Sequence, residues 1–299
     1  MKRKSWCALA RSTIVLAREF GSPPSTSARR RARITYDAPP PARSLTIPSP
    51  FQVDFEFQDP KESDFLGLKA LLGNYLDGEL FSSSELCDAI IKQSTVGTCL
   101  KTQGAGDESD PVAVMSVMNL QTRKDAAPIK EICAHLKNKC PKDLQDKLAS
   151  ALSENGVGLI INERVVNVPQ ETASPLVEGL FDEIEWAQED EPTEELRASF
   201  KFKKYIVFSR VYMDDEAEDE GGKKRKRKRA GEVALVYPRP EDEFFHAESE
   251  WSFQWKSRTA EGKWRSISTS PHRRVFRVLS VRSLSLVSEC RDPQCHFTL

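Results

Sequence analysis

The sequence lacks the motifs that mark the common classes of enzyme. It contains no HExxH, no GxSxG, and no Cys or Ser placed beside a base at motif spacing. Gly156-Val157-Gly158 is a bare G-x-G ahead of a strand, and no helix follows the glycine-rich turn at residues 104–107. Turn chemistry accounts for both segments. We therefore predict a non-enzymatic protein with neither a catalytic nor a cofactor-binding site.

Paired metal-ligand motifs and long apolar runs are also missing. Cys290, Cys295 and His296 have loose ligand-like spacing, but no second CxxC pair accompanies them, so we predict no metal site. No apolar run approaches the roughly 20 residues needed to span a bilayer. Four of the seven cysteines fall inside predicted elements, and we interpret them as buried thiols of a reducing compartment: Cys87, Cys99, Cys133 and Cys140.

Charge is present in abundance but is segregated along the chain. The formal net charge of −1 combines +8 for residues 1–50, −15 for residues 51–255 and +6 for residues 256–299. Without the seven basic residues of one internal run, the central part carries −22. An acidic body suits a basic protein partner and repels bare nucleic acid, although solubility alone also explains such a surface.

The charged loop at residues 214–231 separates two predicted strands. Its first half is acidic, and its second half is an unbroken basic run. We interpret this run as a nuclear-import signal read by an import receptor, because no aromatic residues interleave with it to stack on nucleic acid. The run consists of Lys223, Lys224, Arg225, Lys226, Arg227, Lys228 and Arg229. The Arg-rich, nearly acid-free N-terminus has the composition of an organellar transit peptide, which is the competing interpretation.

Apolar periodicity predicts a single α/β domain over residues 51–255, with a mixed sheet flanked by helices. Residues 51–57 alternate as a half-buried strand. Asp64 caps one helix, Ser82 and Glu85 form a capping box on the next, and Pro141 splits a long helical segment. Basic Ser/Pro/Arg-rich residues 1–50 are predicted to be disordered. Residues 256–299 are predicted to be a poorly ordered basic tail, because arginines interrupt the one possible strand at residues 275–286.

An acidic block precedes the strands that flank the charged loop. Thr193 can cap a short helix there, and acidic side chains in its first turn suit the helix dipole. The block offers a docking site for basic side chains of a partner. Its predicted partner-binding residues are Asp190, Glu191, Glu194 and Glu195.

Several of these segments are similar to one known family. FQVDFEFQDPKESDFLGLKALL, QSTVGT, VGLIINERVVNVP, the EDEPTEELR block and VYPRPEDEFFH resemble the BCCIP family of eukaryotic nuclear proteins over roughly residues 51–255. The resemblance implies an acyltransferase-like (GNAT-like) topology used for binding, in a nuclear adaptor that also shuttles to the cytoplasm.

The same resemblance implies a basic client, a ribosomal protein, chaperoned during assembly and transport of the large ribosomal subunit, with links to the cell cycle and DNA repair. An acyl-CoA-dependent transferase on the same fold is the alternative. The segment after residue 255 does not match the family's closing strand, which predicts an exposed sheet edge.

Overall fold

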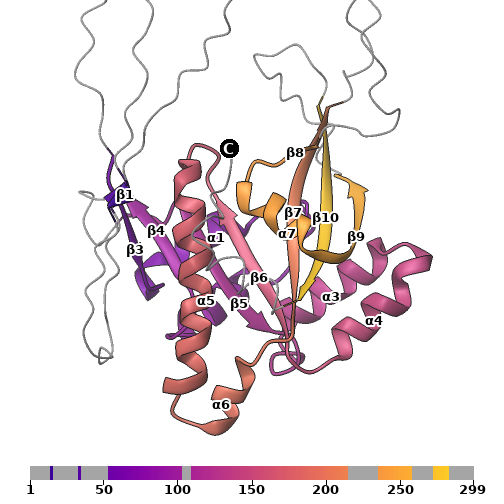
Figure 1. The fold of residues 1–299 in the computed structure, drawn as a ribbon, viewed down its shortest axis with the longest axis horizontal. Coiled ribbons are helices and arrows are strands. Elements are labelled where there is room, and N and C mark those ends of the chain that lie inside the picture. The colour runs from indigo at the N-terminus through magenta and orange to yellow at the C-terminus, as the bar shows by residue number, and fades with distance from the viewer. Residues whose placement is uncertain are drawn as a thin grey trace, which may run out of the picture.

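A computed structural model describes residues 53–102, 109–214, 235–257 and 272–282, with two short strands, β1 (Ile14–Val15) and β2 (Arg33–Ile34). The main body is an open eight-stranded sheet with helices on both faces (Figure 1). Its strands are β3 (Phe55–Gln58), β4 (Thr98–Thr102), β5 (Ala113–Asn119), β6 (Val157–Arg164), β7 (Lys204–Asp214), β8 (Leu235–Val236), β9 (Ser249–Lys256) and β10 (His272–Arg282). Its α-helices are α1 (Phe65–Leu72), α2 (Ser83–Lys92), α3 (Ala127–Lys139), α4 (Gln145–Ser153), α5 (Ala173–Asp190), α6 (Glu194–Ser199) and α7 (Pro240–Ala247). Short 3₁₀ turns lie at Glu62–Asp64, Lys142–Leu144 and Gln170–Thr172.

The strand order across the sheet is β3-β4-β5-β6-β7-β10-β9, and β8 pairs with the end of β7. β6 and β7 run parallel, and the other neighbouring strands among the described residues run antiparallel. The mixed sheet flanked by helices confirms the predicted fold class. The acyltransferase-like topology remains a prediction.

Two hydrophobic cores lie on opposite faces of the sheet. One contains the apolar stripes of α1 to α4, and the other contains those of α5 and α7. The central strand β6 supplies both, since Leu159 and Ile161 join the first core while Ile160 joins the second. A strand covered on both faces needs a continuous apolar run, which explains the sequence VGLII.

Local signals predicted some boundaries correctly. α3 ends at Lys139 and α4 begins after Pro141, which confirms the predicted split. Ser82 does precede α2, but the predicted capping box with Glu85 is wrong. The Ser82 amide and hydroxyl instead donate to the two carboxylate oxygens of Glu131 on α3, at 2.6 and 3.1 Å. The donors of Ser82 at the start of α2 are therefore hydrogen-bonded to an acceptor on another helix.

The C-terminal part differs most from the sequence-based prediction. Residues 272–282, assigned there to a poorly ordered tail, form β10, which lies between β7 and β9 inside the sheet. Val278, Leu279 and Val281 are fully buried. Arg277 does not break the strand, because its guanidinium contacts His246 and Gln254. The predicted loss of a closing strand is therefore wrong. Apart from β1, β2, Lys256 and Ser257, the other residues of both predicted tails lie outside the described residues.

Candidate functional site

The two parallel strands separate part-way along their length. β6 pairs with β7 from Val157 opposite Lys204 to Ile160 opposite Val207. Beyond that point β6 continues beside β5, and β7 continues beside β10. Open α/β sheets commonly bind ligands where neighbouring strands diverge at their carboxyl ends. This opening is therefore a candidate position for a functional site.

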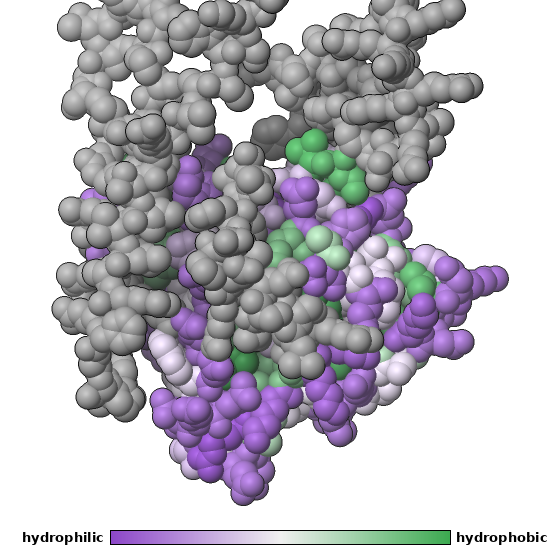
Figure 2. All heavy atoms as spheres, viewed as in Figure 1, coloured by the Kyte–Doolittle hydropathy of each residue, from purple (hydrophilic) through white to green (hydrophobic). Residues whose placement is uncertain are grey.

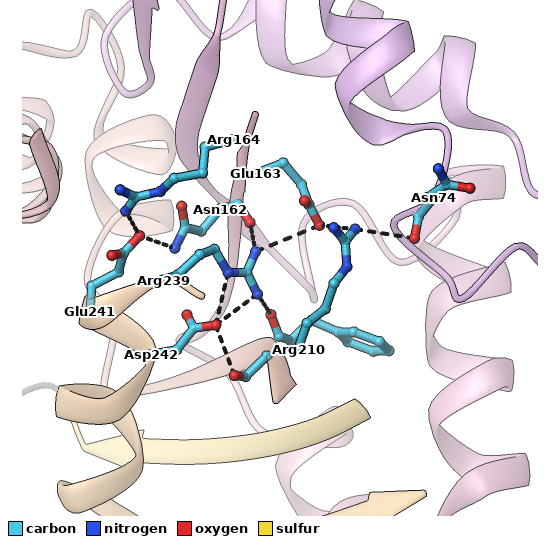
Figure 3. A network of polar contacts seen from close by, with 10 residues as sticks. Asn74, Asn162, Glu163, Arg164, Arg210, Arg239, Glu241 and Asp242 are labelled. Carbon is cyan, nitrogen blue, oxygen red and sulfur yellow. Dashed lines mark hydrogen bonds and ion pairs between the residues drawn. The ribbon is translucent and has the colours of Figure 1, made fainter. Parts of the chain in front are cut away.

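The side chain of Arg239 bridges the opening. Its guanidinium donates to the backbone carbonyl of Asn162 on β6 and, at 2.8 Å, to that of Phe208 on β7 (Figure 3). The side chain is only 5% exposed. A guanidinium carries five donors in a planar fork, so one side chain can satisfy carbonyls on two diverging strands at once.

Three arginines, Arg239 included, and three carboxylates form this charge network. Asp242 accepts from Arg239 and from the Ser209 hydroxyl, both at 2.8 Å. Arg210 donates to Glu163 at 2.6 Å. On the other side of Arg239, Glu241 accepts from Arg164 and from the Asn162 amide, as Figure 3 shows. The positive and negative charges balance within the network.

Burial controls the ionisation of this network. Burial raises the pKa of the Asp242 carboxyl to about 6, although Arg239 opposes that change. Burial alone would lower the pKa of the Arg239 guanidinium, but the charges of Asp242, Glu163 and Glu241 raise it above its ordinary value. Arg239 therefore stays charged, and the arrangement suits a structural bridge between strands better than a reacting group.

The predicted partner-binding acids lie on and just after the last turn of α5. Nine carboxylates and a single arginine occur between residues 173 and 199. Asp190, Glu194 and Glu195 are exposed, whereas Glu191 is half-buried and accepts a hydrogen bond from the Thr95 hydroxyl. Glu191 thus helps to hold α5 against the loop before β4. Thr193 caps α6 as predicted, by accepting from the Leu196 amide at 3.2 Å.

Two apolar side chains accompany these acids. Trp186 is 49% exposed on α5, and Leu196 is 43% exposed on α6. Figure 2 shows a largely hydrophilic surface over α6 and the end of α5, at the bottom of the view. We name this surface the acidic face and define it by Glu185, Trp186, Glu189, Asp190, Glu194, Glu195 and Leu196.

Glu183 is a structural acid that sequence reasoning missed. Its carboxylate accepts from the Gly97 amide at 2.9 Å and from the Thr98 hydroxyl at 2.7 Å. Gly97 and Thr98 belong to the QSTVGT segment, so that segment joins α5 to the sheet. A Gly beside a Thr in a turn is a weak signal of such an anion contact, and the sequence alone does not pair it with Glu183.

The other predicted groups divide between described and undescribed parts of the chain. The basic run at residues 223–229, and Cys290, Cys295 and His296, lie outside the described residues. Cys87, Cys99 and Cys140 are buried free thiols, as predicted, and Cys133 is half-buried. Burial raises the pKa of Cys87 to about 11, which leaves its thiol protonated.

The described residues contain no cluster of three or more metal-ligating side chains. None of the described helices combines the length and hydrophobicity that a membrane span requires.

Fold and site together define an α/β protein whose sheet opening is filled by its own charges and whose helices expose an acidic face. The sequence model of the BCCIP family matches residues 50–245, and the chain belongs to that family. Membership supports a non-catalytic adaptor or chaperone role in the broad sense, since this is not a known enzyme family.

Individual relatives show how far the similarity extends. Protein BCCIP homolog of Arabidopsis thaliana is 40% identical over 215 residues, which span 70% of this chain and 64% of the relative. Protein bcp1 of Aspergillus oryzae is 35% identical over 77% of this chain and 79% of its own length. The crystal structure of BCP1 from Saccharomyces cerevisiae has a TM-score of 0.54 at 20% identity, covering 80% of this chain and 86% of that one. That likeness shows the fold.

Proposed function

We propose that this chain is a nuclear adaptor that chaperones a basic client protein, a ribosomal protein of the large subunit, and escorts it between nucleus and cytoplasm. The acidic face is the observation that carries the proposal. It places exposed carboxylates around an exposed Trp186 and Leu196. Interfaces draw much of their affinity from a few aromatic anchors, and surrounding charges select and steer the partner.

Import through the basic run is the second part of the proposal. Seven consecutive cations match the acidic grooves of an import receptor, and the acidic body of the chain provides no competing basic patch of that length. Replacing residues 223–229 with glutamine should move a fluorescent fusion out of the nucleus. A fusion of residues 1–50 to the same reporter tests the alternative of organelle import.

A pull-down from nuclear extract tests the client directly. The full chain should recover a basic ribosomal protein at low salt and release it as salt rises, because screening weakens contacts between charges. The test variant neutralises four acids of the acidic face: Glu189→Gln, Asp190→Asn, Glu194→Gln and Glu195→Gln. The matched control neutralises four exposed acids beside the helices of the other face: Glu62→Gln, Asp125→Asn, Asp143→Asn and Asp146→Asn.

We expect the test variant to bind the client at least tenfold more weakly than the unaltered chain does. The control variant should bind the client as the unaltered chain does. A further variant, Trp186→Ala, separates the anchor from the charge and should weaken binding with little change in the salt dependence. Recovery of no basic protein by the unaltered chain, or equal loss in test and control variants, would refute the proposal.

The alternative of an acyl-CoA-dependent transferase is favoured by one observation, the diverging parallel strands β6 and β7. Against it, Arg239 and its partners occupy that opening with mutually compensating charges. Calorimetry with acetyl-CoA distinguishes the two functions. We expect no heat of binding, and saturable binding would restore the transferase.

A further inference from the structure

A second polar cluster lies on the α7 face of the sheet, apart from the charge network. Arg277 of β10 and Gln254 of β9 are paired in register and therefore share one face of the sheet. His246, near the end of α7, lies against Arg277, and Tyr237, just before α7, contacts His246. The segment VYPRPEDEFFH thus sends Arg239, Glu241 and Asp242 into the opening between β6 and β7. Tyr237 and His246, near its two ends, join this other cluster.

Among the described residues, no carboxylate forms an ion pair with Arg277. The residue is only 9% exposed. Its guanidinium contacts the uncharged side chain of Gln254, at 2.6 Å, and the weakly basic ring of His246. Its Nε has no hydrogen-bond partner. In the charge network, by contrast, every arginine has a carboxylate partner. A buried cation without an anion is costly, which points to an anion that completes the site.

His246 links this cation to a hydroxyl group. Burial and the Arg277 charge lower the pKa of His246, so its ring is neutral. The Arg277 guanidinium lies within hydrogen-bond distance of both ring nitrogens, and the Tyr237 oxygen lies 2.6 Å from Nδ1. In the tautomer in which Nε2 accepts from Arg277, Nδ1 donates to the Tyr237 oxygen. The hydroxyl proton of Tyr237 then remains for an outside acceptor. The half-buried Tyr237 and His246 leave the cluster reachable from solvent.

We propose that Arg277, His246 and Tyr237 form a binding site for an oxyanion, a carboxylate or phosphoryl group, that receives hydrogen bonds from the guanidinium and the tyrosine hydroxyl. The nearby acids do not fill this role. Asp242 accepts from Arg239 and Ser209 through Oδ2 and makes no ion pair with Arg277, and none joins the exposed Glu243 to Arg277 either. Gln254 is uncharged and does not neutralise Arg277. Its side-chain oxygen accepts from the guanidinium and thereby orients it. The site is independent of the proposed client surface on α5 and α6.

The ring signals of histidine in NMR spectra give a direct test, because the chain has only four histidines. The His246 signal is identified by its loss in His246→Gln, and His135 on α3 serves as an internal control. The pH titration is recorded in sodium phosphate, in sodium acetate, and in sodium chloride at equal ionic strength. An anion beside the ring favours its protonated form, so the pKa of His246 should rise in phosphate or acetate relative to chloride. By linkage, anion affinity should increase as the pH falls.

Variants separate binding at this cluster from general charge effects. Tyr237→Phe removes the hydroxyl that donates to the anion and should weaken anion affinity several-fold. Arg277→Lys retains the charge but loses the guanidinium fork, and should weaken anion affinity further. Lys137→Met removes one exposed cation from α3 and should leave affinity unchanged. Should Arg277→Lys fail to fold, Tyr237→Phe decides the question.

The two anion arms distinguish the ligand class. Tighter binding of phosphate identifies a phosphoryl group, and tighter binding of acetate identifies a carboxylate, either of which supports the site. A His246 titration that is identical in all three salts, or equal anion affinity in Tyr237→Phe and the unaltered chain, would overturn the proposal.

Discussion

Lys101 of β4 and Asp64 at the start of α1 form an ion pair in which the side chains are 1% and 2% exposed. The Asp64 carboxylate also accepts from the Lys61 amide at 3.0 Å. One carboxylate therefore closes the turn before α1 and joins that helix to the sheet. The sequence predicted that Asp64 caps α1, but its side chain makes no capping hydrogen bond to that helix. Its buried cation lies 37 residues away in the sequence.

Removing only the cation should destabilise the protein strongly. Lys101→Met leaves Asp64 buried and unpaired, and the expected loss is about 3–5 kcal/mol in the free energy of unfolding, measured by urea denaturation. The control is Lys130→Met, which breaks the exposed pair with Asp125 and should cost less than about 1 kcal/mol. Equal losses in the two variants would contradict this account of the buried pair.

Arg239 should matter through its geometry as well as its charge. Arg239→Lys keeps the positive charge but cannot donate to both Asn162 and Phe208 while it also contacts Asp242. We expect a loss of about 2–4 kcal/mol in the free energy of unfolding, from the unpaired carbonyls left in the interior. The double variant Arg239→Met/Asp242→Leu should recover part of that loss, because it removes both buried charges. If the double variant recovers no stability, the charges of Arg239 and Asp242 do not compensate each other.

Asp242 should make stability depend on pH in an unusual direction. The unfolded chain releases this proton near the ordinary pKa of 3.8, whereas the folded state retains it to about 6. Folding therefore takes up a proton between these values, and the stability due to Asp242 falls as the pH rises through them.

The measurement is the difference in the free energy of unfolding between the unaltered chain and Asp242→Asn, followed from pH 4 to pH 6. That difference should decline by up to about 3 kcal/mol, at about 1.4 kcal/mol per unit of pKa shift. Asp146→Asn, on the exposed side of α4, controls for the loss of one carboxylate. A difference that grows with pH would contradict the expected sign.

Truncation should show whether β10 belongs to the folded domain. A chain that ends at residue 257 loses the strand between β7 and β9, so β9 keeps no neighbour in the described sheet. We expect this chain to lose cooperative unfolding in urea and near-UV circular dichroism. A chain that ends at residue 285 retains all of β10 and should unfold cooperatively. Cooperative unfolding of the shorter chain would mean that β10 is dispensable.

Local chemistry explains which parts of the fold the sequence predicted. Pro141 stops α3 and Thr193 caps α6 through residues within a few positions of each other. Alternating and stripe-like apolar patterns likewise predicted the strands and helices around both cores. Such signals depend on neighbours in the sequence and can be recognised without the tertiary structure.

The charge network depends instead on partners brought together by the fold. Glu241 and Asp242 look like surface acids in the segment PEDEFF, yet both are fully buried. The charge of Glu241 is neutralised by Arg164, 77 residues away in the sequence. The charge of Asp242 is neutralised by Arg239, whose other contacts lie on two distant strands. The sequence shows that these charges exist but not that they cancel. For the same reason Arg277 suggested an interrupted strand, because its partners His246 and Gln254 come from other elements.

The position of β10 also has a consequence for synthesis on the ribosome. β7 ends at Asp214, but its antiparallel partner is complete only at Arg282. At roughly 5–20 residues per second, translation takes roughly 3–14 seconds to cover the intervening residues. For that interval the nascent chain has a long β7 whose second edge lacks its main partner. The exposed edge of β7 can then pair with other chains and aggregate. A chaperone that covers this edge would have to act before β10 is synthesised.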